Sequence, residues 1–231
     1  MVSNEEKKKK IFKTEINKFY FLAITGSILF TIAAAINLSN KTIQYLRAVN
    51  WFFDYIFAAV IAISLIPIAL SFGGIAELYF KDHVRKEGIQ GRTYLLIYAI
   101  GEILKPFTIG SVVFGSLAIL ISLASRAMGF RKIDLMLTRI KKITEIKVGS
   151  IVYQIFGFYS IIVSVIASIA NAAGDEEFLI YLLVFNGTIE TILMIMIGVK
   201  IIVDVTIIKR YIKRKKIKPR YMRIYGTIRE K

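Results

Sequence analysis

Long apolar blocks alternate with short charged segments along the whole chain. The blocks lie at about residues 16–38, 51–80, 93–124, 148–173 and 178–208. A helix of about 20 apolar residues is long enough to cross a bilayer, and a continuous apolar run leaves no polar face for water. The pattern therefore predicts an all-α fold, a polytopic transmembrane helix bundle with four long spans.

The third block does not fit one ordinary crossing. Residues 93–124 are too many for one span and too few for two, and they include Glu102, Lys105 and Pro106. Because the residue before a proline is pushed out of helical geometry, we expect a bend at Lys105-Pro106. A re-entrant or shallow helical hairpin is the preferred interpretation. The alternative is one or two true crossings, which would give a fifth or sixth span.

The basic residues favour the hairpin. All but four of the 32 Lys and Arg residues lie in segments 1–18, 81–92, 126–147 and 209–231. Cytoplasmic segments collect Lys and Arg, and a hairpin keeps all four segments on that side. We therefore expect a multi-pass protein of the cell membrane with cytoplasmic N- and C-termini. Its parts are a basic tail at 1–15, a transmembrane domain at 16–208 and a second basic tail at 209–231.

Residues 126–147 have the periodicity of an amphipathic helix. Its apolar positions repeat at helical spacing: Ile133, Met136, Leu137, Ile140 and Ile143. We expect this helix to lie on the inner leaflet, with its apolar face in the headgroup boundary. The side chains expected to contact anionic lipid, here and in the C-terminal tail, are Arg131, Lys132, Lys141, Lys142, Lys213, Arg214, Lys215 and Lys216.

The basic C-terminal tail has two other possible partners. Lys and Arg interspersed with tyrosines can hold phosphates and stack on bases, so nucleic acid is one of them, and a protein is the other. Anionic lipid explains the same residues with fewer assumptions and is preferred.

Ionisable residues inside the apolar blocks are candidate functional residues, because burying a charge in the hydrocarbon is costly. Glu190 lies near the middle of the last block, with Asn186 one turn earlier on the same face. This pair could bind a proton or cation, or could hydrogen-bond a neighbouring helix. Glu102 and Lys105 could line an aqueous path at the hairpin tip, or could simply neutralise each other.

Two further patterns have structural interpretations. Ser160, Ser164, Ser168 and Ala172 recur every four residues and predict a helix-packing face, which fits a homo-oligomer or another membrane subunit. Lys200 and Asp204 are spaced for an ion pair near the inner surface.

The outside loop expected at residues 37–50 contains two glycosylation sequons, at Asn37 and Asn40. Such tripeptides also occur by chance. Their position agrees with the expected topology.

The sequence lacks the residues and motifs that several kinds of site require. The chain has no Cys and one His, His83, which leaves no disulfide, no thiolate metal site and little material for a histidine site. It contains no phosphate-binding glycine loop, nucleophile elbow or dinucleotide fingerprint. We therefore expect no enzyme activity, metal or cofactor. Its richness in Ile and Lys suits a thermophile.

The run Gly74-Ile-Ala-Glu-Leu-Tyr-Phe-Lys-Asp, followed by Arg92-Thr-Tyr-Leu-Leu-Ile-Tyr-Ala-Ile, resembles the middle of a family of uncharacterised archaeal polytopic membrane proteins, a domain of unknown function. Arg131-Lys-Ile-Asp, which leads into residues 148–166, resembles it too. The resemblance covers about residues 60–205 and implies an archaeal membrane location. It supplies no activity and no site, and the basic tail and the Glu102/Lys105 pair depart from it.

Two functions follow from these patterns. The first is a small permease or channel-like protein whose path is lined by Glu190, Asn186, Glu102 and Lys105. The second is a non-catalytic subunit or scaffold of a secretion, pilus or DNA-transfer machine, held by the serine stripe and the basic tail.

Overall fold

The computed structural model describes residues 4–45, 51–104, 112–174, 176–217 and 219. Its helices are α1 (Asn4–Tyr45), α2 (Trp51–Tyr79), α3 (Asp82–Leu104), α4 (Val112–Thr144), α5 (Val152–Ala172) and α6 (Glu176–Arg214). All regular secondary structure in the described residues is helical, which confirms the predicted class.

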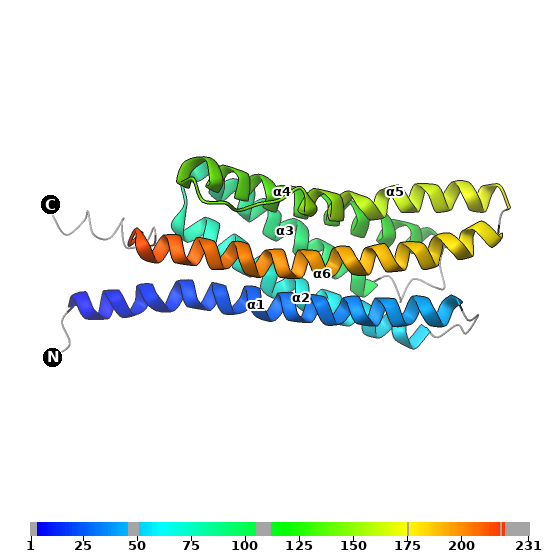
Figure 1. The fold of residues 1–231 in the computed structure, drawn as a ribbon, viewed down its shortest axis with the longest axis horizontal. Helices are drawn as coiled ribbons and strands as arrows, with labels where there is room; N and C mark the ends of the chain where they lie inside the picture. Colours follow the sequence, from blue (N-terminus) through cyan, green and yellow to red (C-terminus); the bar gives the residue numbers. More distant parts are fainter. Residues whose placement is uncertain (1–3, 46–50, 105–111, 175, 218, 220–231) are drawn as a thin grey trace.

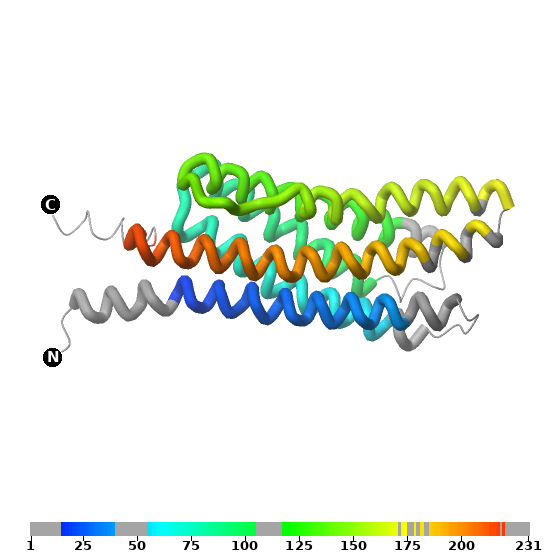
Figure 2. Tube along the Cα trace, viewed as in Figure 1, coloured from blue at the N-terminus to red at the C-terminus, as the bar shows by residue number. Residues whose placement is uncertain are grey.

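Successive helices run in opposite directions, so their connections alternate between the two ends of the bundle (Figure 1, Figure 2). The start of α1, the connection at Lys81, the end of α4 and the end of α6 lie at one end, on the left of both figures. These are the points where the basic segments occur, and we call this the basic end.

Four helices contain stretches that are long and apolar enough to cross a membrane. They are Glu15–Ser39 in α1, Tyr55–Tyr79 in α2, Val152–Ala170 in α5 and Phe185–Arg214 in α6. These stretches match four of the five predicted blocks, so the chain is a multi-pass membrane protein.

The third block lies within a helical hairpin made by α3 and α4, as preferred from the charges, and a single crossing is wrong. A side chain at Gly101 of α3 would meet Ser122 of α4, and one at Gly91 would meet Ile133. Contacts of this register require antiparallel helices. The apolar part of α3, residues 93–104, is only about 18 Å long at 1.5 Å per residue, whereas the hydrocarbon core is about 30 Å thick. The loop at 105–111, with Lys105 and Pro106, lies outside the described residues.

The amphipathic segment differs from its prediction. Residues 126–144 are not a separate surface helix but the second half of α4. Ile133, Met136 and Leu137 of the apolar stripe are fully buried in the protein core, whereas Ile143 is exposed. The periodicity was interpreted correctly, but the stripe packs on α3 rather than on lipid headgroups, because the hairpin carries it back along the bundle.

Small residues allow α1 to approach two neighbours closely. A side chain at Gly26 would meet the backbone oxygen of Ser64 in α2 at 2.8 Å, and one at Gly198 of α6 would meet the Thr31 hydroxyl of α1 at 2.9 Å. Such contacts drive helix association in lipid, where apolar burial alone gives little. Pro67 lies inside α2, which continues through it without a break.

The two longest helices exceed the membrane thickness. α1 has 42 residues and α6 has 39, which correspond to about 63 and 59 Å. Both extend past α3 and α4 at the basic end (Figure 1). The two helices also contact each other, with Lys209 Nζ 3.4 Å from the centre of the Tyr20 ring.

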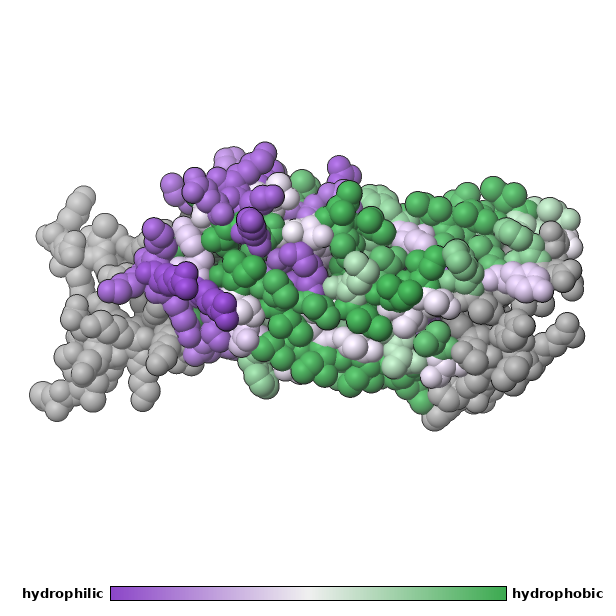
Figure 3. Space-filling view, viewed as in Figure 1, coloured by the Kyte–Doolittle hydropathy of each residue, from purple (hydrophilic) through white to green (hydrophobic). Residues whose placement is uncertain are grey.

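Hydrophilic residues gather at the basic end, and most of the remaining visible surface is apolar (Figure 3). Large exposed side chains such as Phe21, Ile100, Leu120 and Ile162 belong to this apolar surface. A band of this kind faces lipid in a membrane protein.

Candidate intramembrane ion site

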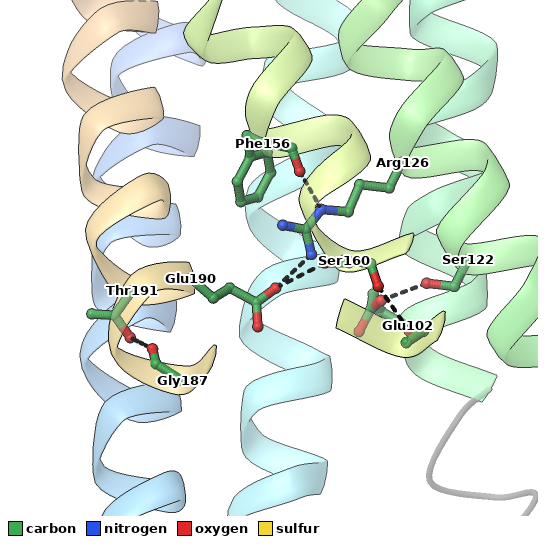
Figure 4. Close-up of polar contacts among 9 residues, drawn as sticks. Glu102, Ser122, Arg126, Phe156, Ser160, Gly187, Glu190 and Thr191 are labelled. Atoms are coloured by element: carbon green, nitrogen blue, oxygen red, sulfur yellow. Dashed lines mark hydrogen bonds and ion pairs between the residues drawn. The ribbon is translucent and has the colours of Figure 1, made fainter. Parts of the chain in front are cut away.

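A buried ion pair joins α4 to α6 (Figure 4). Arg126 Nη1 lies 2.5 Å from Glu190 Oε1, and the two side chains are 5% and 16% exposed. The hydroxyl of Ser160 on α5 donates a weaker bond to the same oxygen, at 3.4 Å. Three helices thus meet at the Glu190 carboxylate.

A second carboxylate lies one turn away along α4. Ser122, four residues before Arg126 and therefore on the same face, donates a 2.6 Å hydrogen bond to Glu102 Oε1 of α3. The buried phenol of Tyr98, one turn before Glu102, is close to Arg126 and to both glutamates. We call the group Tyr98, Glu102, Ser122, Arg126, Ser160 and Glu190 the ion-pair cluster.

Phe156 of α5 holds the guanidinium in place. Arg126 Nε donates to the Phe156 carbonyl oxygen at 3.2 Å, and the guanidinium carbon lies 3.8 Å from the centre of the Phe156 ring. Backbone bonding and a cation–π contact therefore act on one side chain, in surroundings of low dielectric constant where both are strengthened.

The cluster lies at hydrocarbon depth. Glu190 is 14 residues from Glu176, at the far end of α6, and ten residues from Lys200 towards the basic end, or about 21 and 15 Å along the helix. A charge at such a depth costs at least a few kcal/mol unless it is paired, and this arrangement supplies the partners.

The hydrogen bonding of the cluster is incomplete. Arg126 Nη2 and Asn186 Oδ1 are buried without a hydrogen-bond partner among the described residues. Buried polar atoms normally have one, so water or a ligand can bind here.

A second buried carboxylate lies nearer the basic end. Asp204 of α6, fully buried, accepts bonds from Lys200 Nζ at 2.6 Å, the Tyr153 hydroxyl at 3.0 Å and the Gly149 backbone N–H at 3.3 Å. The Lys200–Asp204 ion pair predicted from spacing is confirmed. Its further partners connect α6 to α5 and to the α4–α5 linker.

Aromatic rings separate the cluster from Asp204. Phe156 makes edge-to-face contacts with Phe130 at 4.9 Å and with Phe30 at 5.6 Å, and Phe130 stacks on Tyr153 at 6.4 Å. All four rings are fully buried. Phe30, Phe130 and Phe156, which come from α1, α4 and α5, form what we call the aromatic layer.

The remaining ion pairs lie towards the basic end. Glu87 of α3 pairs with Lys132 and Arg139 of α4 at 2.9 and 3.0 Å. Glu77 at the end of α2 pairs with Arg92 at 3.3 Å. These contacts connect helices near the end of the bundle. They differ in this from the ion-pair cluster and from Asp204, whose charged groups lie deeper between the helices.

The structure brings together most of the predicted polar residues. Glu190 and Glu102 belong to one cluster, and Asn186 lies a turn from Glu190, whereas Lys105 lies outside the described residues. The sequence interpretation missed Arg126, which it assigned to the cytoplasmic flank. A signal existed, since Arg126 lies only two residues beyond the apolar block at 93–124 and five residues before Arg131.

The serine stripe is divided between two environments. Ser160 contacts Glu190, and the Ser164 hydroxyl donates to the Ser160 carbonyl oxygen of its own helix at 2.8 Å. Ser168 and Ala172, further out on α5, are exposed.

The predicted lipid contacts are mostly on the surface. Arg131, Lys141, Lys142, Lys213, Arg214, Lys215 and Lys216 are exposed. Lys132 is half-buried and pairs with Glu87.

The glycosylation hypothesis is wrong for Asn37. Its side chain is 3% exposed inside α1, which continues to Tyr45 and leaves no loop at this position. Asn40 is also in α1, and its side chain lies outside what the structure describes.

No protein-family model matches this chain, and no curated protein or solved structure does. The resemblance to an archaeal family therefore stays a prediction. Fold and site together define a class, a multi-pass helical membrane protein with charged groups buried between its helices.

Proposed function

We propose that the protein translocates an ion across the cell membrane through the half of the bundle formed by α3 to α6. The observation that carries this proposal is the ion-pair cluster, in which Arg126 and two glutamates lie at hydrocarbon depth. Ion pathways are where ionisable groups inside membranes usually occur.

A purely structural ion pair is the simpler alternative, and one feature counts against it. Arg126 Nη2 and Asn186 Oδ1 retain unused bonding capacity at the site. This feature suits a site that binds and releases a ligand.

The test is charge movement after reconstitution into liposomes, measured on a solid-supported membrane after concentration jumps of Na⁺, K⁺ or protons. The wild-type protein is expected to produce a current with at least one of these ions, and Glu190→Gln to abolish it. Glu77→Gln is the matched control, because it removes a carboxylate whose partners lie at the bundle end. A wild-type protein that stays silent with all three ions would contradict the proposal.

A non-transporting subunit of a larger membrane assembly is the second candidate. It is favoured by α5, whose span has only 17% of its residues buried, against 56% for α2, and whose outer stripe residues Ser168 and Ala172 are uncovered. Small residues of this kind admit a second helix. Ser168→Leu should then remove a co-purifying membrane partner, and purification of the wild type as a lone monomer in mild detergent would argue against it.

We further propose that the basic end is cytoplasmic and contacts anionic lipid. Its exposed Lys and Arg side chains follow the bias of cytoplasmic segments, and each attracts an anionic leaflet by about 1 kcal/mol. Nucleic acid is the less favoured partner. Binding of the whole protein to RNA in nanodiscs of neutral lipid, and not to anionic vesicles, would reverse this order.

A further inference from the structure

We infer that the translocated ion is a proton, and that it moves between two buried carboxyl groups of α6, Glu190 and Asp204, across the aromatic layer. This inference rests on the proposed transport function and names its ion and its route.

The partners of the two carboxylates select a proton over a metal cation. Glu190 already has Arg126 at 2.5 Å, and Asp204 has Lys200 at 2.6 Å. A hard metal cation such as Ca²⁺ or Mg²⁺ needs about six oxygen ligands and would be repelled by these cations. In the part of the chain that the structure describes, no three Asp, Glu, His or Cys residues are grouped to hold a metal. A proton needs one oxygen.

The charged and titratable neighbours of each carboxyl group come from α3 to α6. Those near Glu190 are Tyr98, Glu102, Arg126 and Tyr159, and those near Asp204 are Asp134, Tyr153 and Lys200. Among the described residues, no buried charged side chain belongs to α1 or α2. Proton exchange is therefore confined to one half of the bundle.

The aromatic layer keeps the two carboxyl groups apart. Within this layer, Phe156 faces the ion-pair cluster, because its carbonyl oxygen accepts a bond from Arg126. Its ring contacts Phe130, which stacks on Tyr153 on the Asp204 side. The Tyr153 hydroxyl in turn binds Asp204. A hydrophobic constriction of this kind excludes water and hydrated ions until its side chains move.

The helix geometry sets the route. Glu190 and Asp204 are 14 residues apart, close to four turns, so they point to nearly the same side of α6 about 21 Å apart. Ile197, midway between them, is fully buried. The proton therefore has to cross the aromatic layer at Phe156 and Phe130. We assign this step to a transient chain of water molecules that connects the two carboxyl groups.

The charge balance of one cycle follows from these contacts. A hydronium ion gives a proton to a carboxylate oxygen of Glu190, an O–H bond forms, and the ion pair with Arg126 is lost. Displacement of the Phe156 ring then lets water carry the proton to Asp204: the Glu190 O–H bond breaks and its ion pair forms again, while an O–H bond forms on Asp204, which loses its ion pair with Lys200. The Asp204 O–H bond then breaks, the proton passes to water at the basic end, and the second ion pair forms again. No electron moves, and one positive charge crosses the membrane.

The decisive measurement is proton uptake by proteoliposomes that contain a pH-sensitive dye, driven by a potassium diffusion potential with valinomycin. Wild-type vesicles are expected to acidify, with the same rate whether or not Na⁺ is present. Glu190→Gln and Asp204→Asn should each reduce the rate to that of empty vesicles, and Glu77→Gln should not. Each variant is first checked for a monodisperse elution profile.

The outcomes separate the inference from the proposed function. Glu190-dependent movement of Na⁺ or K⁺ without acidification would overturn the proton inference and keep the transport function. No ion movement at all would reject both. Proton uptake that persists in Asp204→Asn would overturn the route.

A variant with an increased rate distinguishes the proposed route from a loss of folding, because a misfolded protein would not transport protons faster. Phe156→Ala is expected to open the aromatic layer and to give faster acidification than the wild type. Phe72→Ala is the control, because Phe72 is equally buried but lies on α2, outside this layer. A Phe156→Ala rate equal to or below that of the wild type would contradict the role of the layer.

Discussion

Arg126 and Glu190 are 64 residues apart in sequence, yet their side chains meet at 2.5 Å in the interior of the bundle. The contact ties the α3–α4 hairpin to α6. Because the hairpin is shorter in its apolar part than a full span, it has less lipid-facing surface to hold it in place, and this ion pair adds a polar contact to α6.

Breaking the pair from one side is expected to destabilise the fold strongly. Arg126→Leu leaves Glu190 buried without its cation, a change that costs about 3–5 kcal/mol in comparable cases. The double variant Arg126→Leu/Glu190→Leu should recover much of that loss, because two apolar groups need no partner. Unfolding free energies of the single and double variants in mixed micelles measure the coupling. Losses that simply add would show that the two side chains do not interact.

Close packing at Gly26 gives a second prediction. Gly26→Val should lower the free energy of unfolding by about 1–3 kcal/mol or more, since the added carbons meet the backbone oxygen of Ser64, which cannot rotate away. Ala35→Val, at an exposed position of the same helix, is the control and should change little. Equal stability of both variants would mean that α1 and α2 are further apart.

The topology can be tested by single-cysteine labelling, since the chain has no natural Cys. Lys86→Cys, Lys141→Cys and Lys216→Cys should be protected together from an impermeant reagent on intact cells, and Ala173→Cys should react. All four positions are exposed. Reaction of position 141 together with position 173 would mean that the third block crosses the membrane once.

Tyr153 is expected to hold the α4–α5 linker through Asp204. Tyr153→Phe removes one donor from a buried carboxylate that also binds the Gly149 N–H, at a cost of about 1–3 kcal/mol. Hydrogen exchange in residues 145–151 should become faster. Tyr181→Phe, at an exposed position on α6, should leave the exchange rate unchanged. An unchanged rate of hydrogen exchange in residues 145–151 of Tyr153→Phe would contradict this role of Asp204.

The spans could be predicted because length and apolar composition are local properties. The ends of the stretches that can span a membrane in α1 and α2 agree with the predicted blocks to within a few residues. The hairpin could be predicted from the placement of Lys and Arg. This placement is a property of whole segments and can be read from the sequence without knowledge of any tertiary contact.

The partner of Glu190 could not be found in this way. The charge rule treats every arginine near a basic segment as a flanking residue, and residues 131–142 after Arg126 contain five Lys and Arg residues. Only the return of α4 along the bundle brings its guanidinium to Glu190. The apolar stripe of α4 was ambiguous for a similar reason, since its spacing is the same against lipid headgroups and against Gly88 and Gly91 of α3.

The great length of α6 has a mechanical consequence. This helix continues without a break from Glu176, past both buried carboxyl groups, to Arg214 beyond the hairpin. Near this end its Lys209 contacts the Tyr20 ring of α1. An unbroken helix acts as a stiff lever. A partner that binds the protruding end and rotates α6 about its axis would move Asp204 and Glu190 together. The two ion pairs are therefore mechanically coupled, and neither can be weakened from that end without affecting the other.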